Sequence, residues 1–149
     1  MEPSLPKRKS GDPLRVLVVD GYPDTAWMLA TALRHLGEDA RHACDGPTAL
    51  RLAGEFRPEA VLMDLVLPEL DAPEVARRLR QEVGLDGVLL VAVTGFHDEA
   101  HRRLARDVGF DLYLIKPVSL DALHGLLHST RDARPVGTTS QGGIRSCSF

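Results

Sequence analysis

Four polar side chains stand at the ends of apolar runs, where uncompensated charge would be costly. Asp20 follows "RVLVV", Asp64 lies in "AVLMDL", Thr94 ends "VLLVAVT" and Lys116 ends "LYLIK". Burying a carboxylate or an ammonium is unfavourable unless the group is paired or binds a cation. Two carboxylates, a hydroxyl and an ammonium together are typical of a site that binds a divalent cation and transfers a phosphoryl group.

The elements that must position these side chains follow from hydrophobic patterning. Nearly continuous aliphatic runs predict four buried parallel strands, at 15–20, 60–65, 88–94 and 112–116. A more polar run predicts an edge strand at 38–43. Helical spacing fills the intervals at 24–37, 46–56, 71–83, 98–109 and 119–130. Such alternation predicts an α/β fold with a parallel sheet, in which ligands bind beyond the carboxyl ends of the strands.

The first predicted helix has an apolar stripe and a candidate cap. Asp24 is expected to cap its N-terminus, and Trp27, Leu29, Leu33 and Leu36 are expected to face the core.

Composition limits the classes of partner. The chain has 149 residues and a formal net charge of −3, so no basic field favours nucleic acid. Its apolar runs are far shorter than the roughly 20 residues of a membrane helix, and the N-terminus lacks the apolar segment of a secretory signal. Cys44 and Cys147 have no metal-site spacing, and Cys44 is expected to be a packed residue. We expect a cytoplasmic protein with no membrane partner.

The motifs "VLVVD", "VLMDLVLPELD", "VAVTGF" and "YLIKP" together resemble the receiver domain of two-component response regulators. The resemblance covers 14–130, leaving 1–13 as a predicted disordered arm and 131–149 as a predicted flexible tail. It implies a flavodoxin-like (βα)5 doubly wound sheet with strand order 2-1-3-4-5.

The resemblance also implies roles for individual residues. Asp64 would accept the phosphoryl group, and Thr94 and Lys116 would contact its oxygens. Tyr113 matches the aromatic switch, whose ring moves inward on activation. The Lys116–Pro117 peptide bond would be cis.

Asp20, Asp64 and the backbone carbonyl of Val66 would bind Mg²⁺. The family usually has a second acid where this chain has Gly21. We expect its loss to weaken Mg²⁺ binding by about 1–2 kcal/mol, or about tenfold. Asp24 is not expected to replace that acid.

Val66 and Phe96 would flank the path of a hydrolytic water. Both are apolar, so slow self-dephosphorylation is expected.

The expected function is signalling, not enzymatic turnover. A histidine kinase or histidine phosphotransfer protein would donate the phosphoryl group. Because no output domain is recognised after residue 130, a conformational switch would act on a downstream protein target, through the face of the fourth helix, fifth strand and fifth helix. An alternative is a degenerate receiver that acts as a phosphorylation-independent interaction module, because Gly21 replaces a metal-binding acid. A phosphohydrolase is disfavoured because Val66 stands where a general acid would be needed.

Two histidine pairs have a spacing of four residues. These pairs are His97 with His101 and His124 with His128. With no acid recognised beside either pair, both are expected to be solvated and not to bind a metal.

Overall fold

The described residues form one sheet of six parallel strands, of which five were predicted and the sixth is a short strand at the edge. The computed structural model describes residues 12–133 and 145–147. The strands are β1 (Arg15–Val19), β2 (Asp39–Ala43), β3 (Ala60–Met63), β4 (Leu89–Thr94), β5 (Leu112–Ile115) and β6 (Arg145–Cys147). They lie in the order β2-β1-β3-β4-β5-β6, and every neighbouring pair is parallel. The predicted order 2-1-3-4-5 is confirmed.

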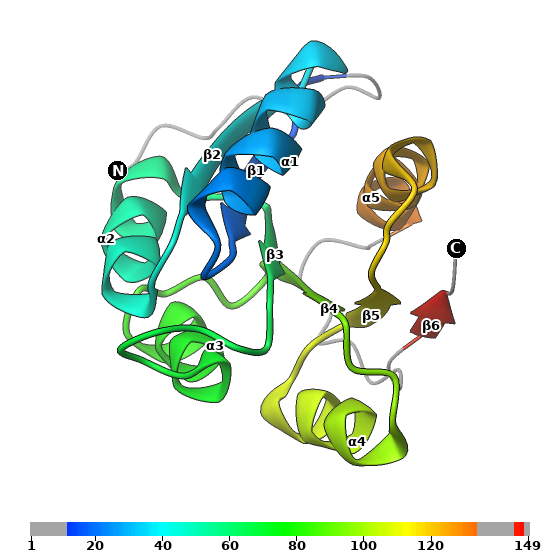
Figure 1. Ribbon diagram of the computed structural model, residues 1–149. Coiled ribbons are helices and arrows are strands. Elements are labelled where there is room, and N and C mark those ends of the chain that lie inside the picture. The colour runs from blue at the N-terminus through cyan, green and yellow to red at the C-terminus, as the bar shows by residue number, and fades with distance from the viewer. Residues whose placement is uncertain (1–11, 134–144, 148–149) are drawn as a thin grey trace.

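Five helices cover the two faces of this sheet (Figure 1). They are α1 (Pro23–His35), α2 (Gly46–Phe56), α3 (Ala72–Gln81), α4 (Glu99–Val108) and α5 (Leu120–Ala133). One core cluster joins the sheet to α2, α3 and α4, and the other joins it to α1 and α5. The fold is therefore a doubly wound α/β sandwich, as the sequence predicted.

Strand side chains alternate between the two clusters. On β1, Leu17 and Val19 pack beneath α2 and α3, whereas Val16 and Val18 face α1 and α5. All four are buried, so the strand needs apolar residues at every position.

Three helices begin at an aspartate that caps them. Asp45 accepts a hydrogen bond from the backbone N of Thr48 at 2.7 Å, and Asp71 accepts one from Glu74 at 3.0 Å. Asp98 does the same for α4. A cap of this kind satisfies one of the helix's unpaired N–H groups and fixes where the helix starts.

The prediction for the start of α1 was wrong. The N-cap is Tyr22, which makes no side-chain capping bond, and Pro23 is the first helical residue. Asp24 lies in the first turn, where its charge favours the helix dipole without capping it.

The predicted core stripe of α1 was also partly wrong. Trp27 is 54% exposed, and the buried residues of the helix are Ala26, Ala30 and Leu33. The stripe is set by two alanines, which are small enough to lie close to the sheet, so the indole lies on the solvent side.

The segment after residue 130 differs from the prediction. α5 continues to Ala133, and Arg145–Cys147 pairs with β5 as a short strand inside the range predicted as a flexible tail. An edge strand has unpaired backbone groups that such a segment can satisfy. The predicted arm up to residue 11, and residues 134–144 and 148–149, lie outside the described part of the chain.

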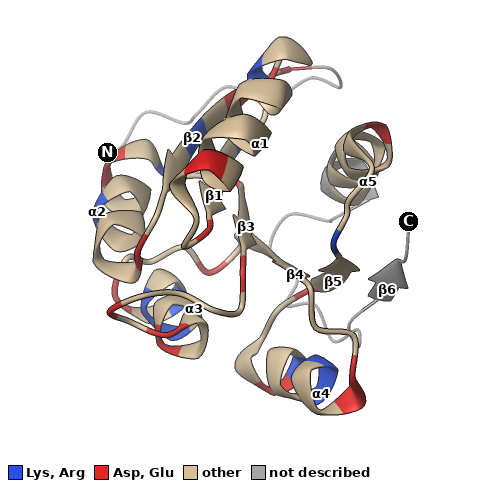
Figure 2. Cartoon of the chain, in the orientation of Figure 1, with Lys and Arg blue, Asp and Glu red and all other residues tan. Residues whose placement is uncertain are grey.

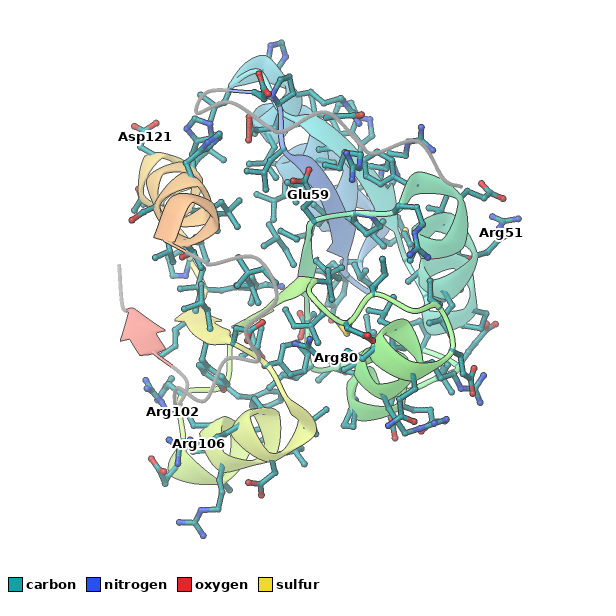
Figure 3. The ribbon with its side chains drawn as sticks, turned by 180° about the vertical axis from the view of Figure 1, so that it is seen from behind. Arg51, Glu59, Arg80, Arg102, Arg106 and Asp121 are labelled. Atoms are coloured by element: carbon teal, nitrogen blue, oxygen red, sulfur yellow. The ribbon has the colours of Figure 1, made fainter. Side chains whose placement is uncertain are left out.

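Arg80 ties α3 to the loop that precedes β5 (Figure 3). Its guanidinium donates to the carbonyl of Gly109 at 3.0 Å and lies 3.3 Å from Oδ2 of Asp111. This contact links neighbouring helices on one face of the sheet.

Candidate functional site

Three charged residues follow three strands at the carboxyl edge of the sheet. Asp20 and Asp64 come directly after β1 and β3, which are paired neighbours, and Lys116 comes directly after β5. The backbone N of Asp64 donates to the carbonyl of Val19 at 2.9 Å, which continues the strand pairing up to the carboxylate.

The ammonium of Lys116 bridges the two carboxylates. Its Nζ lies 2.8 Å from Oδ2 of Asp20 and 2.8 Å from Oδ2 of Asp64. The other oxygens accept backbone hydrogen bonds, Asp20 Oδ1 from Tyr22 at 2.9 Å and Asp64 Oδ1 from Val66 at 3.1 Å. All four carboxylate oxygens therefore accept a hydrogen bond. The peptide bond between Lys116 and Pro117 is cis, as expected.

The side chains of this triad are largely screened from water. Asp20 is 6% exposed, Asp64 12% and Lys116 30%. Burial by itself lowers the pKa of Lys116, but the hydrogen bonds and charges of the two carboxylates outweigh it, so the pKa is raised. The lysine therefore stays charged and keeps a positive charge beside Asp64.

Thr94 and Tyr113 meet at one residue of the loop after β4. The buried Oγ1 of Thr94 accepts a hydrogen bond from the backbone N of Phe96 at 3.3 Å. The buried Tyr113 donates its hydroxyl to the carbonyl of the same Phe96. Burial, with a smaller contribution from the charge of Asp98, raises the pKa of the Tyr113 phenol. The backbone of Phe96 is thus held at its N–H by the Thr94 hydroxyl and at its carbonyl by the Tyr113 hydroxyl.

The position of Gly21 faces the same edge. A Cβ built on it would lie 3.1 Å from Cδ of Pro68 and 3.5 Å from the carbonyl oxygen of Val66. Gly21 does not have a positive φ, so its backbone can accept another residue type. The Cβ of an acidic side chain here would be in ordinary van der Waals contact with the Val66 carbonyl oxygen, and Pro68 would have to shift slightly.

Val66 and Phe96 are both open to solvent on the outer side of the site. Val66 is 60% exposed and Phe96 40% exposed. The ring of Phe96 stacks on His101, with the ring centroids 4.0 Å apart.

Comparison with known proteins identifies the family. A model described as the response regulator receiver domain matches residues 16–128. The chain belongs to the response regulator receiver family. Receiver domains are signalling modules in which phosphorylation and Mg²⁺ binding are typical.

Curated relatives support this assignment. The receiver is 37% identical to the probable transcriptional regulatory protein TcrX of Mycobacterium tuberculosis, over 91% of this chain and 57% of that protein. It is 41% identical to the DNA-binding response regulator MtrA of Mycolicibacterium smegmatis, over 69% of this chain and 44% of that protein. This chain thus spans about half the length of the curated relatives it matches.

Solved structures share the fold. The chemotaxis response regulator CheY4 of Vibrio cholerae has a TM-score of 0.72 and 22% identity, covering 78% of this chain and 98% of that one. The receiver domain of the sensor histidine kinase PA1611 of Pseudomonas aeruginosa has a TM-score of 0.71 and 29% identity, covering 78% and 96%. That structure contains a magnesium ion coordinated in its active-site cleft.

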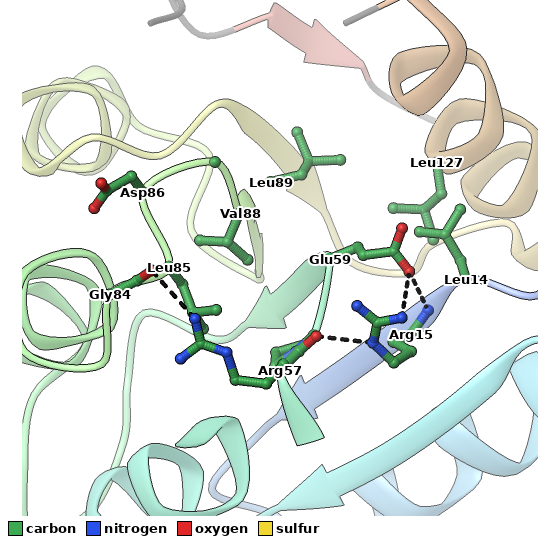
Figure 4. Close-up of a pocket in the computed structure, with 12 residues that line it drawn as sticks. Leu14, Arg15, Arg57, Glu59, Gly84, Leu85, Asp86, Val88, Leu89 and Leu127 are labelled. Carbon is green, nitrogen blue, oxygen red and sulfur yellow. Dashed lines mark hydrogen bonds and ion pairs between the residues drawn. The ribbon is translucent and has the colours of Figure 1, made fainter. Parts of the chain in front are cut away.

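A pocket of about 460 Å³ lies at the opposite edge of the sheet, where the strands begin (Figure 4). Its charged lining is largely paired within the protein. Arg15 lies 3.7 Å from Glu59 and donates to the carbonyl of Arg57 at 2.9 Å, and Arg57 donates to the carbonyls of Val83 and Gly84. The pocket contains none of the predicted site residues, so we do not assign it a role in their chemistry.

The structure overturns the expectation that neither histidine pair has an acid beside it. In the first pair, Nδ1 of His101 lies 2.6 Å from Oδ1 of Asp98, the residue that caps α4. His124 and His128 do have a nearby acid, because Nε2 of His128 lies 2.7 Å from Oε2 of the buried Glu38. Glu38 and His128 are 90 positions apart in sequence, and only the packing of α5 beside the turn before β2 brings them together. No signal in the linear spacing could have found this contact.

Within the described ranges 12–133 and 145–147, no helix has the length and apolar character required to span a membrane. Both acidic and basic residues occur on α3 and on α4 (Figure 2).

Proposed function

We propose that this receiver takes up a phosphoryl group on Asp64 from a phosphohistidine of a histidine kinase or phosphotransfer protein. The observation that carries the proposal is the bridging ammonium of Lys116, 2.8 Å from both Asp20 and Asp64. A fixed cation in a largely dry site stabilises charge that develops on a transferred phosphoryl group.

The transfer is a substitution at phosphorus. A carboxylate oxygen of Asp64 forms a bond to phosphorus while the bond between phosphorus and the donor's imidazole nitrogen breaks. The imidazole leaves with the electron pair and takes up a proton from water, and Asp64 becomes an acyl phosphate. Lys116 then exchanges part of its contact with the carboxylate for a phosphoryl oxygen.

The oxygen donors at this edge fit Mg²⁺, which takes carboxylate and carbonyl ligands and keeps several waters. Asp20 and Asp64 supply carboxylates, and the Val66 carbonyl faces the same side as Gly21. Gly21 offers no side-chain ligand, so we expect weakened binding. When bound, the ion would neutralise charge on the phosphoryl oxygens.

Thr94 and Tyr113 could couple phosphorylation of Asp64 to a conformational change of the loop after β4. The Thr94 hydroxyl can donate to a phosphoryl oxygen, but turning toward it would loosen the 3.3 Å bond from the backbone N of Phe96. The hydroxyl of Tyr113 donates to the carbonyl of the same Phe96. A shift of this loop would therefore move or break the hydrogen bond of the tyrosine. Phosphorylation would thereby bias two arrangements of the face formed by α4, β5 and α5.

We expect that face to bind a downstream protein target, in the cytoplasm. The relatives are named as transcriptional or DNA-binding regulators, and this chain matches about half of their length. It stays a prediction that this chain itself binds neither nucleic acid nor a membrane and does not turn over a substrate.

A second candidate function is a receiver that binds its partner without phosphorylation. Gly21 favours it, since the position facing the Val66 carbonyl lacks the second acid. Partner binding by such a module would not depend on Mg²⁺ or on Asp64.

Incubation with acetyl phosphate, read by intact mass, tests the main proposal. We expect Mg²⁺-dependent gain of one phosphoryl group by the native chain and none by Asp64→Asn. Asp71→Asn is a matched control in the same loop, because asparagine preserves the cap of α3. If the native chain gains nothing from acetyl phosphate or from a phosphorylated histidine donor, the second candidate replaces the first.

A further inference from the structure

A second polar cluster lies far from Asp64, between α5 and the turn before β2. The side chain of Glu38 is only 3% exposed, and its backbone N is fixed by a 3.0 Å hydrogen bond to the carbonyl of Leu33. Its Oε2 lies 2.7 Å from Nε2 of His128, and its Oε1 lies 3.9 Å from Nε2 of His124.

The cluster has one polar atom whose hydrogen-bonding capacity is unused. The Nε2 atom of His124 is buried and has no hydrogen-bond partner among the described residues. An unsatisfied buried polar atom is costly and uncommon in native proteins. A simple ion pair between Glu38 and His128 gives no reason for a second imidazole whose Nε2 lies buried beside the same carboxylate.

The arrangement has the form of a metal-ligand set. Positions four apart on a helix lie on one face, and the His124 and His128 rings have centroids 4.8 Å apart. One ligand atom from each histidine and one carboxylate oxygen of Glu38 lie within 4.8 Å of one another.

The donor types select the class of metal. Two imidazole nitrogens and one carboxylate oxygen are a known ligand set for Zn²⁺ with an open fourth position, whereas Mg²⁺ and Ca²⁺ prefer oxygen throughout. We propose that Glu38, His124 and His128 bind a zinc-type divalent transition-metal ion. A water molecule would take the fourth position. The side chains of His124 and His128 are 30% and 21% exposed, although the Nε2 atom of His124 itself is buried.

Small side-chain movements would complete the site. Tetrahedral zinc ligands lie about 3.3 Å apart, so the 2.7 Å contact must lengthen and the longer ones must shorten. The ion takes the place of the hydrogen bond between Glu38 and His128 and engages the unpartnered nitrogen of His124. It would link α5 to the turn before β2, at the edge of the sheet opposite Asp64.

Zinc binding to the full chain, by competition with a chromophoric chelator in excess Mg²⁺, tests this site. We expect one Zn²⁺ per chain, and a loss of affinity of more than about tenfold in His124→Gln, in His128→Gln and in Glu38→Gln, since even outer-shell partners are worth 10- to 100-fold. The other histidine pair is the control, so the His97→Gln/His101→Gln double variant and Asp64→Asn should bind zinc as the native chain does.

A spectroscopic measurement on the native chain keeps the test independent of how the variants fold. Binding should shift the imidazole nitrogen resonances of His124 and His128 and leave those of His97 unchanged. The proposal is overturned if the native chain does not compete with the chelator. It is also overturned if zinc shifts only other histidines, or if the control variants lose zinc as strongly as the cluster variants.

Discussion

The two edges of the sheet differ in how completely their buried polar groups are satisfied. At the carboxyl edge, every carboxylate oxygen of Asp20 and Asp64 accepts a hydrogen bond, and one lysine bridges the pair. At the amino edge, Glu38 is paired with His128, while the buried Nε2 of His124 has no hydrogen-bond partner among the described residues and lies 3.9 Å from Oε1 of Glu38.

This difference indicates how each site would work. The carboxyl edge is charged and preorganised, so a reaction there needs little rearrangement, as expected where positive charge must meet a phosphoryl group. The amino edge is incomplete, so a ligand there gains by satisfying an unused nitrogen. We therefore expect variants at one edge to leave the other unaffected, because the two sites share no residue.

The largest effect should come from removing the bridging cation. Lys116→Met should slow phosphoryl uptake by about 100-fold, the typical loss when one preorganised group that stabilises transition-state charge is removed. Zinc affinity should not change. Initial rates of uptake from acetyl phosphate, read by intact mass, give the value.

Arg80→Met is the matched control for that variant, since Arg80 is also a cation paired with an aspartate. Loss of a single donor of this kind usually costs far more than about twofold in rate. If Lys116→Met takes up the phosphoryl group within about twofold of the native rate, the main support for the carboxyl-edge site is removed.

Gly21→Asp should restore a metal ligand and tighten Mg²⁺ binding by about tenfold. The Cβ of the new aspartate would lie 3.5 Å from the Val66 carbonyl oxygen, with Pro68 shifting slightly. Isothermal titration with Mg²⁺ measures the change. Gly54→Asp adds the same charge on α2 where a new side chain meets nothing, so an equal gain in that variant would mean that net charge alone is responsible.

A smaller effect is expected for the lifetime of the acyl phosphate. Val66→Asn and Phe96→Asn should each speed its decay by about fivefold, equivalent to about 1 kcal/mol of barrier, by admitting and holding water. Loss of the phosphoryl mass with time provides the rate. Leu104→Asn, at another exposed apolar residue, should decay as the native chain does, and equal decay in all three variants would contradict this account.

The smallest effect is expected at an exposed ion pair that belongs to neither edge. Hydrogen bonds from Arg77 and then Arg78 lower the pKa of Glu74 to about 2 from its ordinary 4.5. A lowered folded-state pKa means that the stabilisation is present above pH 4.5 and is lost as the pH falls toward 2. At neutral pH, the denaturant midpoint of the native chain should be slightly higher than that of the Glu74→Gln variant.

That advantage should disappear on acidification. A difference between the two midpoints that stays constant from neutral pH down to pH 2 would show that the Glu74 carboxylate contributes nothing through its charge. Added salt should also reduce it, which separates this exposed cluster from the screened triad at the carboxyl edge.

The sequence predicted the carboxyl edge well because its signal is local. Aliphatic runs define buried strands, and a charged residue directly after such a run must lie at the strand's end, so Asp20, Asp64 and Lys116 could be placed together. The sequence predicted α1 less well, because Trp27 is apolar and in phase with a helix, yet two alanines face the sheet instead.

The amino edge could not be predicted, because it depends on a contact between remote segments. Nothing near Glu38 marks it as the partner of histidines 90 positions away. The pairing of Arg145–Cys147 with β5 was missed for a similar reason, since a backbone contact at a sheet edge requires no particular side chains.

The most direct test of the central claim is to locate the phosphoryl group after uptake in Mg²⁺. Borohydride reduces an aspartyl phosphate to homoserine and releases phosphate, so the modified residue can be identified by peptide mass. We predict homoserine at position 64 and at no other aspartate. Homoserine at another aspartate, or modification at position 64 that occurs equally without Mg²⁺, would contradict the proposal that Asp64 is the acceptor of a metal-assisted receiver.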